Sequence, residues 1–323
     1  MSHPKRGWVD PRLIMASLLV SFWAQQSQGM AEIDVRNTLS RTVGQTQDDG
    51  RVTPALTAVS WRPTSVYVAT YAGAMNYRDA VGKDSALLGG LYGSVGNRAY
   101  VLEGESDFTG IRSRGQADIR QWDLSLAYAN YSPGGWRQRL GGHLIKCNDE
   151  LTRDGLMMFS GIRYLDRDRW SMGVEGCYSS YPHYIPSLVV GQLTGHFGVN
   201  LFRGKTWSVW NDLREYWIEP SADVGFGKDS FLSTEDRVTL RWARASLAVF
   251  GWQGEQVFAA RNDGLTVFNV AEMHKHGVGF EAACVFTGRM TGKIVVSHES
   301  FEQYGSAKES SVDLLLGMLV VRI

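Results

Sequence analysis

The sequence predicts an all-β fold: an antiparallel transmembrane β-barrel of about 14 strands, with short periplasmic turns and longer extracellular loops. Three observations lead to this fold class. Among 323 residues there are 36 glycines, 11 Trp, 13 Tyr and 13 Phe but only 8 prolines, which favours long β-strands. Alternating polar and apolar positions recur along most of the chain,. The links between these segments are short and long in turn,.

Charge and hydropathy exclude two classes of function. The 33 basic residues balance the 33 acidic residues, which argues against a nucleic-acid binder that neutralises phosphates over a basic surface. The mean hydropathy of −0.20 argues against a bundle of membrane helices, because such a bundle needs repeated apolar runs of about 20 residues.

The N-terminus predicts export. Three basic residues precede the apolar run 13–24, and small residues suited to cleavage follow it,. We expect a cleavable signal peptide over 1–29, which directs the protein to the cell outer membrane. The polar stretch 30–64 is then a periplasmic or lumen-inserted segment, and the barrel occupies 65–323.

Fourteen candidate strands follow without a break. Each has about 11 to 16 residues, whereas a globular strand has about 5 or 6 and a tilted transmembrane strand needs about 9–11. Their ranges are 65–77, 85–95, 98–109, 117–131, 136–147, 154–165, 170–181, 187–202, 205–218, 230–243, 245–259, 275–286, 291–302 and 311–323.

The links sharpen this prediction. Every second link is a tight turn, such as Gly96-Asn97, and the links between are longer, the longest being 260–274. This asymmetry is typical of outer-membrane barrels. The loop 219–229 is open to two interpretations: a constriction folded into the lumen or a surface loop.

Apolar and charged side chains fall on opposite faces of these strands. In 117–131, Trp122 and Leu124 alternate with Asp123. If the charged faces point inward, they line an aqueous pore and set a transverse field across it. We expect the pore-lining residues to be the acids Glu103, Glu105, Asp107 and Asp123 and the bases Arg137, Arg139, Arg163, Arg237 and Arg241.

Aromatic residues gather beside the tight turns, where an interfacial girdle of a membrane barrel is expected. They are Tyr131, Trp136, Tyr164, Trp170, Phe202, Trp207, Trp242 and Phe286.

With these features the chain resembles the Gram-negative outer-membrane β-barrel superfamily, porin-like in size, over 65–323 and the export signal. The resemblance is one of architecture and points to no specific family. It implies a channel for small hydrophilic solutes, contact with outer-membrane lipid and lipopolysaccharide, and insertion by the barrel-assembly machinery. It leaves homo-oligomer formation open.

Two alternative functions remain. On the strand 291–302, His298 and Ser300 share a face, and outer-membrane phospholipases and lipid A deacylases are similar in carrying His-x-Ser on a strand. That resemblance implies a lipid acyl hydrolase with Ser300 as nucleophile, His298 as base and Asp313 as the group that orients the histidine. Phe301 stands where those families have asparagine. The other alternative is a structural barrel that sheaths a partner protein.

Other motifs predict no cofactor or metal. There is no P-loop and no GxGxxG after a strand,. His274 and His276 lie in a predicted loop without a carboxylate at ligand spacing,. Cys147, Cys177 and Cys284 are isolated thiols by spacing, although a Cys147–Cys177 bridge stays open,.

Overall fold

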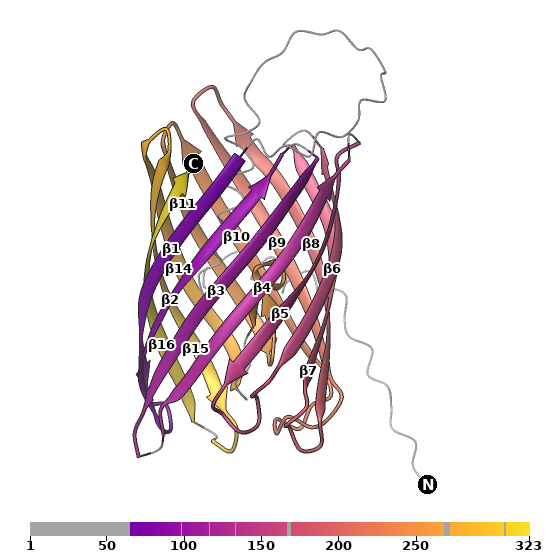
Figure 1. Cartoon of the computed structure of the whole chain (residues 1–323), viewed down its shortest axis with the longest axis vertical. Helices are drawn as coiled ribbons and strands as arrows, with labels where there is room; N and C mark the ends of the chain where they lie inside the picture. The colour runs from indigo at the N-terminus through magenta and orange to yellow at the C-terminus, as the bar shows by residue number, and fades with distance from the viewer. Residues whose placement is uncertain are drawn as a thin grey trace, which may run out of the picture.

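The protein is a closed barrel of fourteen antiparallel strands (Figure 1). The computed structural model describes residues 65–323 except 98, 116, 133, 167–168, 268–271 and 307. The predicted signal peptide 1–29 and the segment 30–64 lie outside the described residues and stay predictions. No helix in the described ranges is long and apolar enough to span a membrane.

All fourteen predicted strands are present, and their ends differ from the predicted ones by at most four residues. The barrel strands are β1 (Ser65–Arg78), β2 (Lys83–Gly96), β3 (Tyr100–Ser113), β4 (Ile119–Tyr131), β5 (Trp136–Cys147), β6 (Leu156–Asp166), β7 (Trp170–Tyr181), β8 (Leu188–Arg203), β9 (Trp207–Pro220), β10 (Phe231–Trp242), β11 (Ala245–Gln256), β14 (Glu272–Thr287), β15 (Met290–Gln303) and β16 (Glu309–Arg322).

The first and last strands close the barrel. β1 pairs with β16 from Tyr67↔Arg322 to Arg78↔Ser311. The Ile323 amide donates to the Val66 carbonyl at 3.0 Å. The start of β1 and the end of β16 therefore lie at the same rim, the upper one in Figure 1. Closure leaves no sheet edge unpaired, as a strand barrel in lipid requires.

The two rims differ in their links. At the rim that holds the two ends of the barrel, the links have two to four residues, and at the other rim they have four to fifteen. We call these the short-turn rim and the loop rim. The turn before β5 shows why glycine is needed there: Gly135 has φ +86°, and a Cβ would lie 2.5 Å from the Leu165 carbonyl oxygen,.

The outer wall is an apolar belt. Leu126, Leu140 and Met158 are 59, 60 and 62% exposed. The residues before and after them on each strand face the interior, as the predicted alternation of the two faces requires,. Exposed apolar surface of this extent is unfavourable in water. It matches the lipid-facing band of a transmembrane barrel.

Aromatic side chains form a row at the short-turn rim. The Phe202 and Trp207 rings stack at 3.9 Å between centroids. The centroid of the Tyr164 ring lies 5.1 Å from that of Trp136 and 5.2 Å from that of Trp170. These contacts bring five of the eight predicted girdle residues together in two groups at one end of the barrel, as interfacial aromatics are arranged in membrane barrels,.

The interior also has an apolar part, which was not predicted from the sequence. The inward faces of β1 and β16 are apolar and buried, and they pack together with β2, β15 and Leu265. Members of this cluster are Ala69, Met75, Ala86, Val295, Val312, Leu314, Leu316 and Met318.

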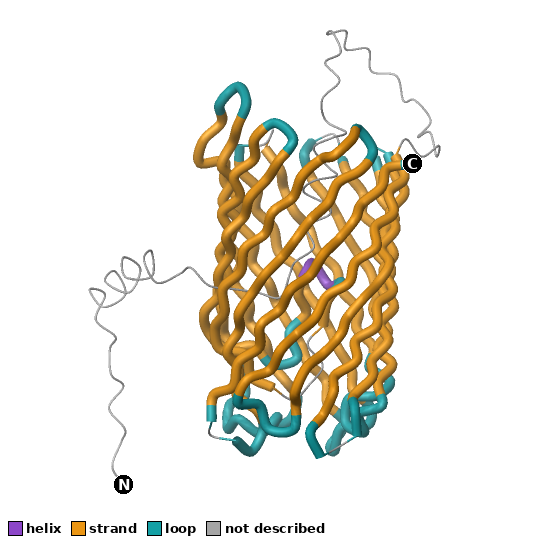
Figure 2. Tube along the Cα trace, turned by 90° about the vertical axis from the view of Figure 1, so that its left-hand side faces the viewer, coloured by secondary structure: helices purple, strands orange, loops and turns teal. Residues whose placement is uncertain are grey.

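The link between β11 and β14 folds into the barrel (Figure 2). Its described part contains the strand β12 (Ala260–Arg261), the 3-10 turn η1 (Asn262–Gly264) and the strand β13 (Thr266–Val267), and β12 pairs with β13. We call 257–267 the inward loop. It is this link, predicted as an extracellular loop, that enters the lumen. In the link 221–230, Val224 is fully buried in the same apolar cluster as Val257 and Phe258.

The structure also tests the predictions for the histidines of 274–276 and for the three cysteines. His274 belongs to β14 and not to the predicted link 260–274, because β14 begins at Glu272, and His276 lies in the same strand. Cys147, Cys177 and Cys284 are all free thiols, so the isolated-thiol interpretation is confirmed and the Cys147–Cys177 bridge is absent.

Candidate functional site

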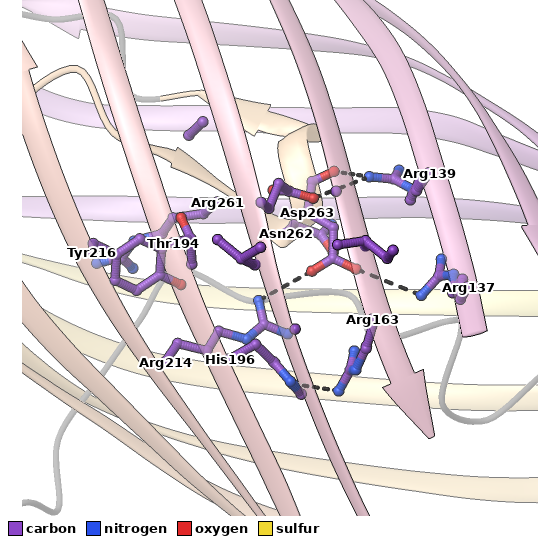
Figure 3. A pocket seen from close by; sticks show the side chains of 16 residues that line it. Arg137, Arg139, Arg163, Thr194, His196, Arg214, Tyr216, Arg261, Asn262 and Asp263 are labelled. Carbon is purple, nitrogen blue, oxygen red and sulfur yellow. Dashed lines mark hydrogen bonds and ion pairs between the residues drawn. The ribbon is translucent and has the colours of Figure 1, made fainter. Parts of the chain in front are cut away.

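Five arginines converge inside the barrel around the tip of the inward loop. Arg137 and Arg139 come from β5, Arg163 from β6, Arg214 from β9 and Arg261 from β12. The four on the wall strands β5, β6 and β9 occupy inward positions of the two-residue alternation, and Arg261 belongs to the inward loop itself,. Figure 3 shows Arg137, Arg139 and Arg214 in contact with Asp263, and Arg163 in contact with His196. We call these five residues the arginine cluster.

Asp263 is the loop residue that the cluster holds. Its carboxylate lies 3.4 Å from Arg214 and 4.0 Å from Arg137, and its backbone carbonyl accepts a hydrogen bond from Arg139. The residue has φ +48°, in the left-handed region, which aspartate tolerates better than most side chains. Side-chain charge and backbone conformation together place one carboxylate among the guanidinium groups.

The inward loop is fixed at two further points. The Gln192 side-chain amide donates to the Ala260 carbonyl at 2.7 Å and accepts from the Ala260 amide at 2.8 Å. This pair of hydrogen bonds replaces the strand partner that β12 lacks on that side. Gly264 has φ +83°, and a Cβ there would lie 2.4 Å from the Phe159 ring on β6. The loop therefore packs closely against the wall.

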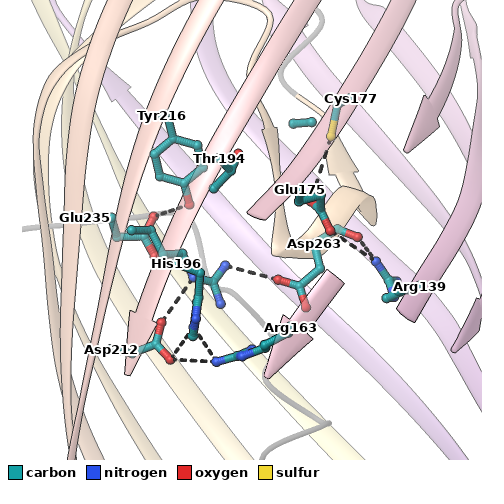
Figure 4. A network of polar contacts seen from close by, with 12 residues as sticks. Arg139, Arg163, Glu175, Cys177, Thr194, His196, Asp212, Tyr216, Glu235 and Asp263 are labelled. Carbon is teal, nitrogen blue, oxygen red and sulfur yellow. Dashed lines mark hydrogen bonds and ion pairs between the residues drawn. The ribbon is translucent and has the colours of Figure 1, made fainter. Parts of the chain in front are cut away.

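A second carboxylate organises the wall beside the cluster. Asp212 lies 2.9 Å from the His196 ring nitrogen Nε2, 3.3 Å from Arg163 and 3.3 Å from Arg214 (Figure 4). Arg163 also contacts His196. Buried guanidinium groups need such partners, so Asp212 fixes the arginines that face the loop.

The predicted acidic residues lie next to the basic ones, because β4 pairs directly with β5. Glu103 forms an ion pair with Arg139 at 3.2 Å. Glu105 accepts a hydrogen bond from the Tyr71 hydroxyl at 2.7 Å. Asp123 lies 3.0 Å from the His143 ring nitrogen, and Asp107 is its cross-strand neighbour.

The predicted bases of β10 lie apart from the arginine cluster. Arg237 forms a 2.8 Å ion pair with Glu281 on β14, which Lys293 on β15 also contacts at 2.8 Å. Arg241 is half-buried close to the end of β10 at the short-turn rim. The structure thus brings Arg137, Arg139 and Arg163 together and leaves these two elsewhere on the wall.

The inward loop lies between two cavities. One of about 50 Å³ lies between its tip and the arginine cluster, with Thr194, His196 and Tyr216 in its lining. The other, of about 160 Å³, lies between Leu265–Val267 and the strands β1, β3, β15 and β16. The loop is therefore a partition inside the barrel.

Sequence reasoning missed several residues of this site. Asp212 and Arg214 share the inward face of β9 with Tyr216, and face parity would have found them. Arg261 and Asp263 carried no such signal, because an Asn-Asp-Gly turn in a long link looks the same whether the link points inward or outward,.

Of the three residues of the predicted hydrolase site, the structure joins His298 to Asp313 but does not join Ser300 to His298. The His298 Nδ1 atom lies 2.7 Å from Asp313 Oδ1, and Arg78 also contacts Asp313 at 2.7 Å. Ser300 is buried. Within the described part of the chain, it forms no side-chain hydrogen bond with His298.

Metal-ligand geometry is not found among the described residues, where no three His, Cys, Asp or Glu side chains are grouped to hold an ion. His274 instead lies 3.1 Å from Glu299 on the neighbouring strand.

No family model matches the chain, and no curated protein matches it. Solved structures are similar in fold. A CymD monoaromatic hydrocarbon channel matches with a TM-score of 0.50 and 5% identity over 80% of this chain and 88% of its own. A bacterial polysaccharide outer membrane secretin matches with a TM-score of 0.49 and 10% identity over 80% of this chain and 98% of its own. The Pseudomonas putida toluene transporter TodX matches with a TM-score of 0.48 and 7% identity over 81% of this chain and 90% of its own. The CymD match and the closed fourteen-strand barrel show that the chain has the fold of outer-membrane β-barrels.

Proposed function

We propose that the protein is an outer-membrane, porin-like channel for small hydrophilic solutes, and that solutes pass between the inward loop and the arginine cluster. The single observation that carries this proposal is the contact of Asp263 with Arg137 and Arg214 inside a closed barrel. Opposite charges across a narrow passage in a low-dielectric wall select solutes by charge.

Other features support the proposal. The apolar belt and the aromatic row suit an outer-membrane location. The similar fold of CymD, a monoaromatic hydrocarbon channel, supports passage of a solute through such a barrel. Of the predicted pore-lining residues, Arg137, Arg139 and Arg163, with Glu103 paired to Arg139, line the solute path in this proposal. Glu105, Asp107 and Asp123 face the larger cavity, and Arg237 and Arg241 lie elsewhere on the wall.

Conductance of the purified barrel tests this function. Protein refolded in detergent and shown to be folded by heat-modifiable gel mobility should give stepwise, ohmic currents in a planar lipid bilayer, because the proposed channel is a charged, water-accessible path across the membrane. A mock preparation without the protein is the control. Folded protein that inserts but never conducts would contradict the channel.

One observation favours the hydrolase as a second candidate. His298 and Asp313 are joined through Nδ1, which leaves Nε2 as the atom that could accept a serine proton,. Both lie on the face of their strands that carries the exposed Ile294 and Leu315, where a lipid substrate would be.

Lipid hydrolysis separates this candidate from the channel. Incubation with phospholipid vesicles should release fatty acid if Ser300 is a nucleophile, and Ser300→Ala should then abolish the release while folding is unchanged. Ser311→Ala, which changes the cross-strand partner of Ser300, is the matched control. The channel function predicts no release from either form of the protein.

A further inference from the structure

The larger cavity, on the far side of the inward loop from the arginine cluster, combines an apolar floor with acidic flanks. Its floor is formed by Met75 on β1 and by Leu314 and Leu316 on β16. Leu265 of the inward loop covers it. We call it the amphipathic cavity.

Carboxylates flank this floor from both directions. Glu105, Asp107 and Asp123 come from β3 and β4, and Glu272 and Glu299 come from β14 and β15. The cations in the lining are Lys83 and the two histidines His143 and His274. Five carboxylates face one lysine and two histidines, so acidic groups outnumber basic groups in the lining.

The three cations of the lining contact Glu272, Glu299 and Asp123, the last through His143 at 3.0 Å. Glu105 accepts a hydrogen bond from the Tyr71 hydroxyl. Lys83 lies 2.7 Å from Glu272, and His274 lies 3.1 Å from Glu299. In the described residues, Asp107 has no cation within ion-pair distance, and its cross-strand neighbour is another carboxylate, Asp123. A positive charge placed beside Asp107 would be strongly attracted in this low-dielectric environment.

Two buried polar atoms also face the cavity without a partner. The Ser297 hydroxyl belongs to a side chain only 8% exposed, and His143 is only 2% exposed. Neither Ser297 Oγ nor His143 Nδ1 has a hydrogen-bond partner in the described structure. Buried polar atoms are ordinarily satisfied, and a hydroxyl oxygen can accept a hydrogen bond from an N–H donor.

We propose that the amphipathic cavity binds a small organic ammonium ion with one apolar ring or branch. The ammonium group lies toward Asp107 and Asp123, and the hydrocarbon body packs on Met75, Leu314 and Leu316. The cavity volume of about 160 Å³ suits a single ring, since a cavity of about 150 Å³ holds benzene. This site goes beyond the proposed channel and does not depend on conduction.

Calorimetric titration of the folded, detergent-solubilised barrel with 2-phenylethylammonium tests the proposal. The expected result is saturable one-to-one binding, at least about tenfold tighter than that of the uncharged 2-phenylethanol, with no saturable binding of phenylacetate. An affinity for 2-phenylethanol equal to that for the ammonium ion would overturn the proposal and assign the cavity to uncharged aromatics. Absence of saturable binding would also overturn it.

Variants locate the site. Asp107→Asn should weaken binding by about tenfold or more, and Ser297→Ala should weaken it to a smaller extent. Glu235→Gln is the matched control, because Glu235 is an inward carboxylate outside this cavity that accepts a hydrogen bond from Tyr216 at 3.0 Å. Unchanged affinity in folded Asp107→Asn or Ser297→Ala protein would contradict the assignment, as would an equal loss in Glu235→Gln.

Discussion

Asp263 places a carboxylate of the chain itself where an anionic solute would meet the guanidinium groups of the wall. It shares Arg214 with Asp212, at 3.4 and 3.3 Å. The Asp263 side chain is 21% exposed, and its contacts with Arg214 and Arg137 together with the hydrogen bond from Arg139 to its carbonyl hold the loop tip. The charge of this one residue sets the balance between positive and negative groups at the passage.

Residue contacts also organise the loop rim. Asp154 contacts Lys146 and lies 3.2 Å from His183, which joins the link 148–155 to the link 182–187. The hydrogen bond from Lys146 lowers the pKa of the Asp154 carboxyl. A carboxyl with a lowered pKa stabilises the folded state above its ordinary pKa, and this contribution is lost as pH falls through the lowered value.

Hydrogen exchange tests this contact. At pH 7 the Asp154→Asn variant should show exchange a few-fold faster in 182–187, because the neutral amide loses the charged contacts with Lys146 and His183. Exposed Asp229, in the link 221–230, provides the control as Asp229→Asn. Exchange in 182–187 that is unchanged in Asp154→Asn would show that the two links are not coupled.

At the scale of elements, the strands were predictable and the interior was not. Leu124 and Leu126 alternate with Asp123 and Ser125, so one face of β4 is unambiguously apolar. In β16 the segment from Leu314 to Val321 is apolar on both faces apart from Gly317. The two faces of this segment do not differ in polarity, so the alternation does not show which face is buried. For this reason the apolar floor of the larger cavity was not predicted.

The inward loop could not be predicted for a different reason. Its position depends on contacts far away in sequence, with Gln192, Arg137 and Arg214. Local turn chemistry in 262–264 indicates only a bend. The sequence left two interpretations for the link 219–229, and the element that enters the lumen is the next long link along the chain.

In the whole molecule, one loop lies between the arginine cluster with its partner carboxylates and a larger cavity rich in carboxylates and apolar side chains. Fourteen strands enclose more space than their own side chains fill, and the loop with its partners occupies part of it. The arginine cluster lies on one side, with the carboxylates and apolar floor on the other. This division separates the path proposed for solutes from the cavity proposed for an organic ammonium ion.

The reversal potential of the channel in a KCl gradient tests the central claim most directly. Asp263→Asn removes a negative charge from the passage and should shift selectivity toward anions. The double variant Arg137→Glu/Arg139→Glu should shift it toward cations. Heat-modifiable mobility verifies that each variant is folded. Opposite shifts are the predicted result, and reversal potentials equal to that of the unmodified protein in both folded variants would contradict a conducting path past the inward loop.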